Sequence, residues 1–266
     1  MEQFLIHKVL ALPPVTVGGM ALDLSITNSI VMMMVAAVLI AALFGSAAKG
    51  ALVPGRMQAL GETLFDLIDG TLVTPIIGHH GKPYIPFVMT IFMLVLTMNL
   101  MGVVLAVGGV AGLHLNFTPT AQLAVTATLA VLTFVSVLVI GFAKNGLNMY
   151  KLFVPSGMPL AMVVVMVPIE MISFFVRPLT LAMRLFGNIL GGHVVMNIFA
   201  SFVVALGTFG LAGGLASLGF LGAGASLAMV VALTGLELVV AGLQAFVFAA
   251  LATVYLNEVV NLGHGH

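Results

Sequence analysis

Long, uninterrupted apolar runs make up most of the chain and are joined by short segments that hold its few charges. Three of these runs have the length of a single crossing, at residues 26–44, 87–107 and 121–142. A helix needs about 20 apolar residues to cross the hydrocarbon core of a bilayer. Strands of a membrane barrel alternate apolar and polar residues, which these runs do not. The pattern therefore predicts membrane-spanning helices.

Two longer apolar runs follow, at residues 159–206 and 225–260, with a glycine-rich segment between them. A helix of about 45 residues would be ~68 Å long, about twice the ~30 Å hydrocarbon core. Each run is therefore either broken into two crossings or one long, strongly tilted helix. Hydropathy leaves both alternatives open. Both give an even number of crossings, so in either case the C-terminus lies on the same side of the membrane as residue 159.

Two further segments are predicted to lie at the membrane surface. In 57–78, three acids alternate with apolar residues at helical spacing, which gives an amphipathic helix with one polar face. The N-terminal segment, 1–25, is predicted to begin with an interfacial helix that ends at Pro13 and Pro14. It lacks the basic start and clean apolar core of a cleaved signal peptide.

The composition excludes a soluble protein. Of 266 residues, 62% are hydrophobic and 6% are charged, whereas soluble domains carry about 25% charged residues. Eight basic and eight acidic residues balance, so nothing suggests a nucleic-acid partner. The absence of cysteine excludes disulfides and cysteine-ligated metal, and no cofactor or metal is expected. The predicted fold is an all-α, polytopic membrane protein with about five spans plus interfacial helices.

The positions of the basic residues predict the orientation. They lie after the first and third spans and not between the second and third: Lys49, Arg56, Lys82, Lys144 and Lys151. By the positive-inside rule, residues 45–86 and 143–158 are cytoplasmic and the N-terminus is outside. The C-terminus is then cytoplasmic.

Five ionisable residues lie inside the last two apolar runs: Glu170, Arg177, Arg184, His193 and Glu237. A charge at mid-membrane costs about 2.5–3.5 kcal/mol on insertion scales, so such residues normally face a partner or water. The first three are seven positions apart, and such positions drift only ~20° per step around a helix. Asn188, one turn beyond Arg184, completes a polar stripe on this face.

His193 points elsewhere, because it lies nine positions after Arg184, about 180° round the helix and ~13 Å along it. On the last helix, Glu237 and Gln244 are also seven apart and share a face. A second helix thus offers a carboxylate that the histidine can meet. A histidine–glutamate pair can titrate near neutral pH and relay protons.

Most of these residues also have a structural interpretation. Glu170 and Arg177 would form an ion pair within their helix, although seven positions are too far for direct contact without help. Arg177 would alternatively extend its side chain to an interface. His193 and Glu237 would be a buried structural pair, and the two amides ordinary hydrogen bonders between helices.

Arg184 is the residue that a structural role explains least. No acid of the chain lies one turn away on its helix, so its counter-charge must come from elsewhere. Arginine stays protonated and passes no proton on, but it repels protons and stabilises a passing anion. At about 4 Å and an effective dielectric constant of 20, the attraction is ~4 kcal/mol, enough to deprotonate an acid that arrives beside it.

Two motifs here resemble subunit a of F-type ATP synthases. PLTLAMRLFGNILGGHVV resembles the family's arginine helix, with its RLFGN core at 184–188. LELVVAGLQAFVFAALATVYL, at 236–256, resembles its last helix, and TMNLMG, at 97–102, is similar to the end of its second span. The resemblance implies that the last two runs are two long, tilted helices. The chain would then be one membrane domain, 1–266. Its parts would be an N-terminal interfacial segment (1–25), the first three spans with a cytoplasmic interfacial helix near 57–78 (26–158), and a tilted two-helix hairpin that carries the proton path (159–266).

The resemblance also implies a function, in which the chain performs no chemistry itself. It would form two offset half-channels that carry protons to and from carboxylates of a rotor ring, with Arg184 separating them. The outer half-channel would be lined by Asn188, His193, Glu237 and Gln244, and Glu170 matches an acid near the inner one. Many bacterial members of the family have an acid at the position of His193 and a histidine at the position of Glu237. Such an exchange is what a direct contact between the two residues permits. It also argues that the transported ion is a proton rather than sodium. The implied partners are the rotor c-ring and peripheral-stalk b-type subunits, in a bacterial inner membrane rather than a mitochondrial one.

Two other classes of function are weighed against this one. A secondary transporter would bind an anionic substrate at Arg184, but it predicts related halves, and the sequence has no detectable repeat. An intramembrane protease would need a serine–histidine dyad, paired aspartates or an H-E-x-x-H motif, and the spans contain no such aspartate pair or motif. No nucleotide-binding G-x-x-x-x-G-K-[ST] motif occurs either.

Overall fold

The computed structural model describes residues 8–10, 15–17, 20–22, 25–48, 54–108, 119–153, 160–211 and 217–262. Five of its helices are long and apolar enough to cross a membrane. They are α1 (Asn28–Ala47), α4 (Ile85–Gly108), α5 (Leu123–Asn145), α6 (Leu160–Gly210) and α7 (Gly219–Val260). The prediction of an all-α, multi-pass membrane protein with about five spans is confirmed.

The last two apolar runs each form one helix, of 51 and 42 residues. Pro168 and Pro178 lie inside α6 without ending it, because neighbouring groups in a membrane protein can satisfy the freed carbonyls. At 1.5 Å per residue these helices are ~76 and ~63 Å long. Since this is at least about twice the hydrocarbon core, they fit the long, strongly tilted alternative rather than four short crossings.

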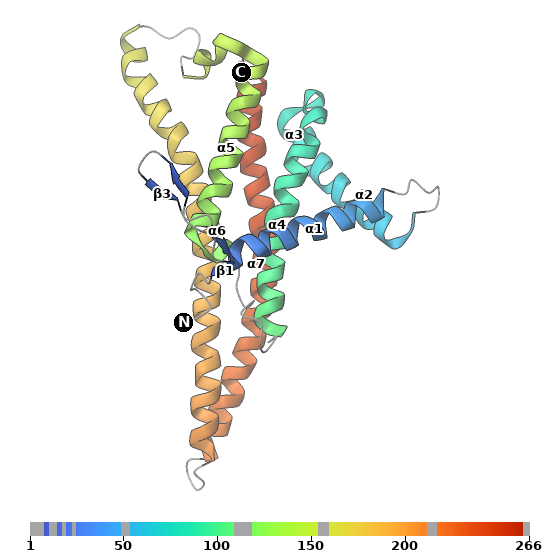
Figure 1. Cartoon of the computed structure of the whole chain (residues 1–266), viewed down its shortest axis with the longest axis vertical. Helices are drawn as coiled ribbons and strands as arrows, with labels where there is room; N and C mark the ends of the chain where they lie inside the picture. Colours follow the sequence, from blue (N-terminus) through green and yellow to red (C-terminus); the bar gives the residue numbers. More distant parts are fainter. Residues whose placement is uncertain are drawn as a thin grey trace.

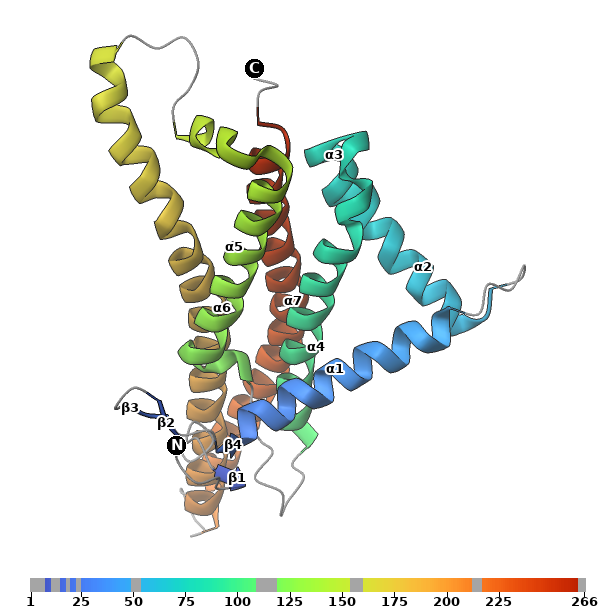
Figure 2. The ribbon, with the colours of Figure 1, turned by 45° about the horizontal axis from the view of Figure 1, so that its top comes forward.

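α6 and α7 form an antiparallel hairpin that organises the molecule (Figure 1). At its closed end the backbones approach closely, since a Cβ on Gly219 would lie 2.6 Å from the carbonyl oxygen of Leu206. Only glycine fits such an approach. At the other end α5 lies between the two helices, as Figure 2 shows. The hairpin therefore exposes one long face and packs the other against the rest of the chain.

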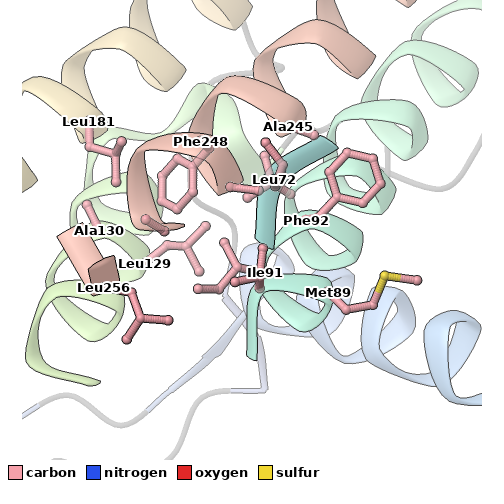
Figure 3. Close-up of a cluster of buried hydrophobic side chains, with 14 of the residues drawn as sticks. Leu72, Met89, Ile91, Phe92, Leu129, Ala130, Leu181, Ala245, Phe248 and Leu256 are labelled. Carbon is pink, nitrogen blue, oxygen red and sulfur yellow. The ribbon is translucent and has the colours of Figure 1, made fainter. Parts of the chain in front are cut away.

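The apolar core surrounds α7. Phe248 and Leu256 of α7 are fully buried and lie among side chains from the other helices, with Leu181 of α6 and Ile91 of α4 nearby (Figure 3). Burying such side chains contributes about 1.5–3 kcal/mol each. The part of the hairpin near the turn between α6 and α7 exposes large apolar residues such as Val204 and Leu221, as lipid or a membrane partner requires.

The segment between α1 and α4 is helical, as expected. α2 (Arg56–Ile68) continues through a π-helical stretch, η2 (Asp69–Val73), into α3 (Thr74–Ile77). It ends at Gly78, whose φ of 83° favours glycine, and a 3₁₀ segment, η3 (His79–Tyr84), leads into α4. The position of this helix at a membrane surface stays a prediction.

The prediction of an N-terminal helix up to Pro13 is wrong for the residues that the structure describes. Lys8–Leu10 is a strand, β1, paired antiparallel with β4 (Ile26–Thr27). β2 (Val15–Val17) pairs with β3 (Met20–Leu22). Val9 of β1 and all three residues of β2 are β-branched, which favours the extended backbone. The rest of that predicted helix lies outside the described residues.

The remaining elements are short 3₁₀ segments. η4 (Pro119–Ala121) precedes α5, and η5 (Gly146–Leu152) follows it. α5 ends at Gly146, which has a φ of 53°.

Candidate functional site

The polar side chains of the hairpin form two separate groups with Arg184 between them along α6. One group joins α6 and α7 at residues 188–193 and 237–244, and the other joins them at residues 170–177 and 255–258. Arg184 lies seven positions from the nearest arginine and four from the nearest amide, about 10 and 6 Å along the helix axis. The chain therefore holds a fixed cation between two polar regions.

Arg184 is exposed on α6, and it forms no ion pair or hydrogen bond with the part of the chain that the structure describes. Its neighbours on the same helix, Leu185 and Leu181, are fully or nearly fully buried. The backbone of this turn is thus anchored in the core while the arginine side chain is exposed. This agrees with the expectation that its counter-charge comes from outside the chain.

Asn188 and Gln244 link the two helices directly. The Nδ2 atom of Asn188 donates to Oε1 of Gln244 over 2.9 Å. Gln244 is buried, whereas Asn188 is exposed on the face that carries Arg184. The bond therefore connects the surface of the hairpin with its interior.

His193 and Glu237 lie side by side between the helices. The distance from Nε2 of His193 to Oε1 of Glu237 is 3.6 Å, and the residues are only 5% and 6% exposed. Neither carboxylate oxygen of Glu237 accepts a hydrogen bond from the described residues. A buried oxygen without a donor is unfavourable, so this carboxylate needs water or a proton. The sequence anticipated that the two residues could meet.

A pocket of about 310 Å³ adjoins Glu237 of this pair. Its polar walls are Asn188, Glu237 and Gln244. The remaining lining is apolar or glycine: Ile189, Gly192, Leu233, Leu236, Val240 and Leu243. A space of this size has room for several water molecules, which polar groups on its walls can hold.

The second group centres on Arg177. Its guanidinium forms an ion pair with Glu258 of α7, and its Nη2 atom lies 3.6 Å from Oε1 of Glu170. The guanidinium carbon Cζ of Arg177 is 5.3 Å from the ring centroid of Phe174 and 5.1 Å from that of Tyr255, which is within cation–π range. One cation therefore holds two carboxylates from two helices.

This group differs from the sequence prediction in two ways. Glu170 and Arg177 do approach within ion-pair distance, because the long arginine side chain bends along its helix. The prediction also omitted Glu258 as the partner of Arg177. The signal was present, since Glu258 lies fourteen positions after Gln244 and so continues the seven-residue spacing from Glu237.

The chemistry available here is proton transfer and charge stabilisation. The described residues contain no group of three or more histidines or acids that could hold a metal ion. The pair of His193 and Glu237 can exchange a proton through water. The two carboxylates at Arg177 carry one negative charge in excess of the arginine, and that excess attracts protons.

Comparison with known proteins gives one consistent family. The ATP synthase A chain family matches residues 29–257. ATP synthase subunit a of Allorhizobium ampelinum is 43% identical over 267 residues, which cover 100% of this chain and 98% of that one. Subunit a of Nitrobacter hamburgensis is 42% identical over 93% of both chains, and that of Erythrobacter litoralis is 40% identical over 98% of this chain and 96% of its own. These matches span nearly the whole length, and the chain belongs to the ATP synthase subunit a family.

Proposed function

We propose that this chain is the proton-translocating stator subunit of an F-type ATP synthase. It forms two offset half-channels, and Arg184 keeps them apart. The observation that carries the proposal is the exposed Arg184, which has no ion pair or hydrogen bond with the described residues and lies along α6 between two buried or half-buried polar groups. An isolated cation in a membrane requires an anion, and a rotor-ring carboxylate is an anion that arrives from another polypeptide.

The outer half-channel leads to the group of His193 and Glu237. Protons enter through the pocket beside Asn188 and Gln244, pass by His193 and Glu237, and protonate a rotor carboxylate. The neutral acid can then turn into lipid, which a carboxylate cannot do at acceptable cost. The pocket, the 3.6 Å contact and the unsatisfied oxygens of Glu237 support this role.

The inner half-channel leads away from the second group. After nearly a full turn, the rotor acid approaches Arg184 from the other side and loses its proton. An attraction of ~4 kcal/mol at about 4 Å favours the carboxylate form at that point. Glu170 and Glu258 then accept the released proton and pass it to the cytoplasm. Their joint negative charge around Arg177 supports this assignment.

The separation of the two groups couples transport to rotation. A proton cannot move directly from one group to the other past the fixed positive charge of Arg184. Each proton that crosses 100 mV releases about 2.3 kcal/mol, and this energy becomes available only when the ring turns. The chain binds no nucleotide in this scheme and is not an enzyme by itself.

The proposal includes partners and an orientation. The rotor c-ring faces the exposed side of the hairpin, and peripheral-stalk b-type subunits hold the chain against torque. The membrane is a bacterial inner membrane, with the N-terminus outside and the C-terminus in the cytoplasm. The domain limits named from the sequence, including the hairpin from residue 159, remain part of the proposal.

The test is Arg184→Ala in the complete complex. We expect loss of ATP-driven proton pumping in inverted vesicles and of proton-driven ATP synthesis, with the complex still assembled. Passive proton leak through the membrane sector should rise, because nothing then separates the half-channels. Met183→Ala, at the preceding exposed position, is the matched control and should pump normally. Intact coupled pumping by Arg184→Ala would overturn the proposal.

A further inference from the structure

Gly192 lies directly against the carboxyl group of Glu237. A Cβ atom on Gly192 would be 3.0 Å from Oε1 of Glu237, 3.4 Å from its Cδ and 3.7 Å from its Cγ. The oxygen concerned is the one that lies 3.6 Å from Nε2 of His193. The bare backbone of Gly192 and the ring of the next residue therefore bound the same carboxylate oxygen.

Other glycines of this helix do not share this relationship. Cβ atoms on Gly187 and Gly191 would meet nothing within 4 Å. Among the glycines whose surroundings the structure describes, Gly192 alone faces an ionisable side chain. A general need for close helix packing at this turn does not account for that, because the adjacent Gly191 faces open space.

Packing, rather than hydrogen bonding, places this carboxylate. Both oxygens of Glu237 are buried and accept no hydrogen bond from the described residues, so no donor on those residues fixes the side-chain rotamer. A methyl group on Gly192 would press on this carboxylate at closer than ordinary contact distance. The side chain would have to move by a few tenths of an ångström.

We propose that Gly192 is a positioning residue of the proton path: its missing side chain leaves the space in which the Glu237 carboxylate lies beside His193. The inference rests on the proposed function and adds a residue to it. It acts through Glu237 and takes up no proton itself. It also explains why a weak helix former stands at this position, where alanine would favour the helix.

The test compares Gly192→Ala with Gly207→Ala in the complete complex, reconstituted in vesicles. A Cβ atom on Gly207, also in α6, would meet nothing within 4 Å, and this position lies about 140° round the helix from Arg184, away from the face assigned to the rotor. The readout is the rate of passive proton conduction through the membrane sector. A displacement of 1 Å can cost about 100-fold in a proton-transfer step, so we expect Gly192→Ala to conduct about tenfold more slowly. Gly207→Ala should conduct at the wild-type rate, although both changes favour the helix equally.

Combining each change with Glu237→Asp tests the mechanism. The shorter aspartate does not reach Gly192, so Gly192→Ala should have little further effect in that background, whereas Gly207→Ala should remain neutral in both. A helix-packing role for Gly192 predicts the same slowing in both backgrounds, which would overturn the inference. Wild-type conduction by Gly192→Ala would overturn it too. The proposed function would survive either result if Arg184→Ala still abolished coupling.

Discussion

Arg177 and Glu258 are 81 positions apart in the sequence and form an ion pair between α6 and α7. The guanidinium also holds Glu170 and contacts the rings of Phe174 and Tyr255. Its charge is therefore shared by two acids from two helices and partly enclosed by aromatic rings. This group ties α6 to the last turn of α7.

Removing the central cation should destabilise the hairpin. Arg177→Met leaves Glu170 and Glu258 near each other without a counter-charge, and we expect a loss of about 1.5–3 kcal/mol, the range for hydrogen bonds to charged groups. Glu258→Gln should cost less, because Glu170 still pairs with the arginine. Thermal melting of the purified complex in detergent measures both. Ile172→Met, at an exposed position, serves as the control, and unchanged melting of Arg177→Met would contradict the prediction.

Replacing the histidine should slow proton movement without uncoupling the complex. We expect His193→Ala to reduce ATP-driven pumping by about 100-fold, the lower range for proton transfer by a positioned side chain. His193→Gln should be equally slow, since an amide keeps the polarity but does not titrate. Arg177→Met should slow pumping less. Equal slowing by His193→Ala and Arg177→Met would count against the relay.

The amide pair offers a test by exchange. Asn188→Ala leaves the buried Oε1 of Gln244 without its donor, which we expect to cost about 1–3 kcal/mol. The double exchange Asn188→Gln with Gln244→Asn keeps the total side-chain length and should recover most of that stability. The comparison uses melting temperatures of the purified complex. If the exchange melts as low as Asn188→Ala, the hydrogen bond is not what holds this contact.

Gly141 of α5 should tolerate no side chain. Its Cβ would lie 2.7 Å from Cε of Met149, which can move, and 3.0 Å from Cβ of Val259, which is fixed to α7. Overpacking of this kind costs about 1–3 kcal/mol, so Gly141→Ala should melt at a lower temperature. Gly45→Ala in α1 meets nothing within 4 Å and should melt as wild type or slightly higher. Similar melting of the two variants would show that α5 can shift away from α7.

The long apolar runs predicted the membrane class and the three single crossings, because transfer into lipid is a local property of about 20 residues. The N-terminal helix was predicted wrongly because it was inferred from the interrupted apolar character of this segment and from its prolines, whereas β1 is fixed by pairing with β4. Pairing with a distant segment is not visible in a local pattern.

For the candidate site too, local helical spacing predicted some features, and contacts between helices were missed. Helical spacing placed His193 away from Arg184, and Glu237 and Gln244 on one face, since the angle between positions on a helix depends only on their separation. The partner of Arg177 was missed, because contacts between helices depend on how two helices are set against each other.

The sequence by itself determined that this chain spans a membrane as helices, and that it carries an arginine without an acid one turn away. Only the tertiary structure decided that each long run is one helix, that Asn188 meets Gln244, and that Arg177 meets Glu258. The physical reason is range: hydrophobicity and helical periodicity act over neighbouring residues, whereas these contacts arise from the packing of α6 against α7.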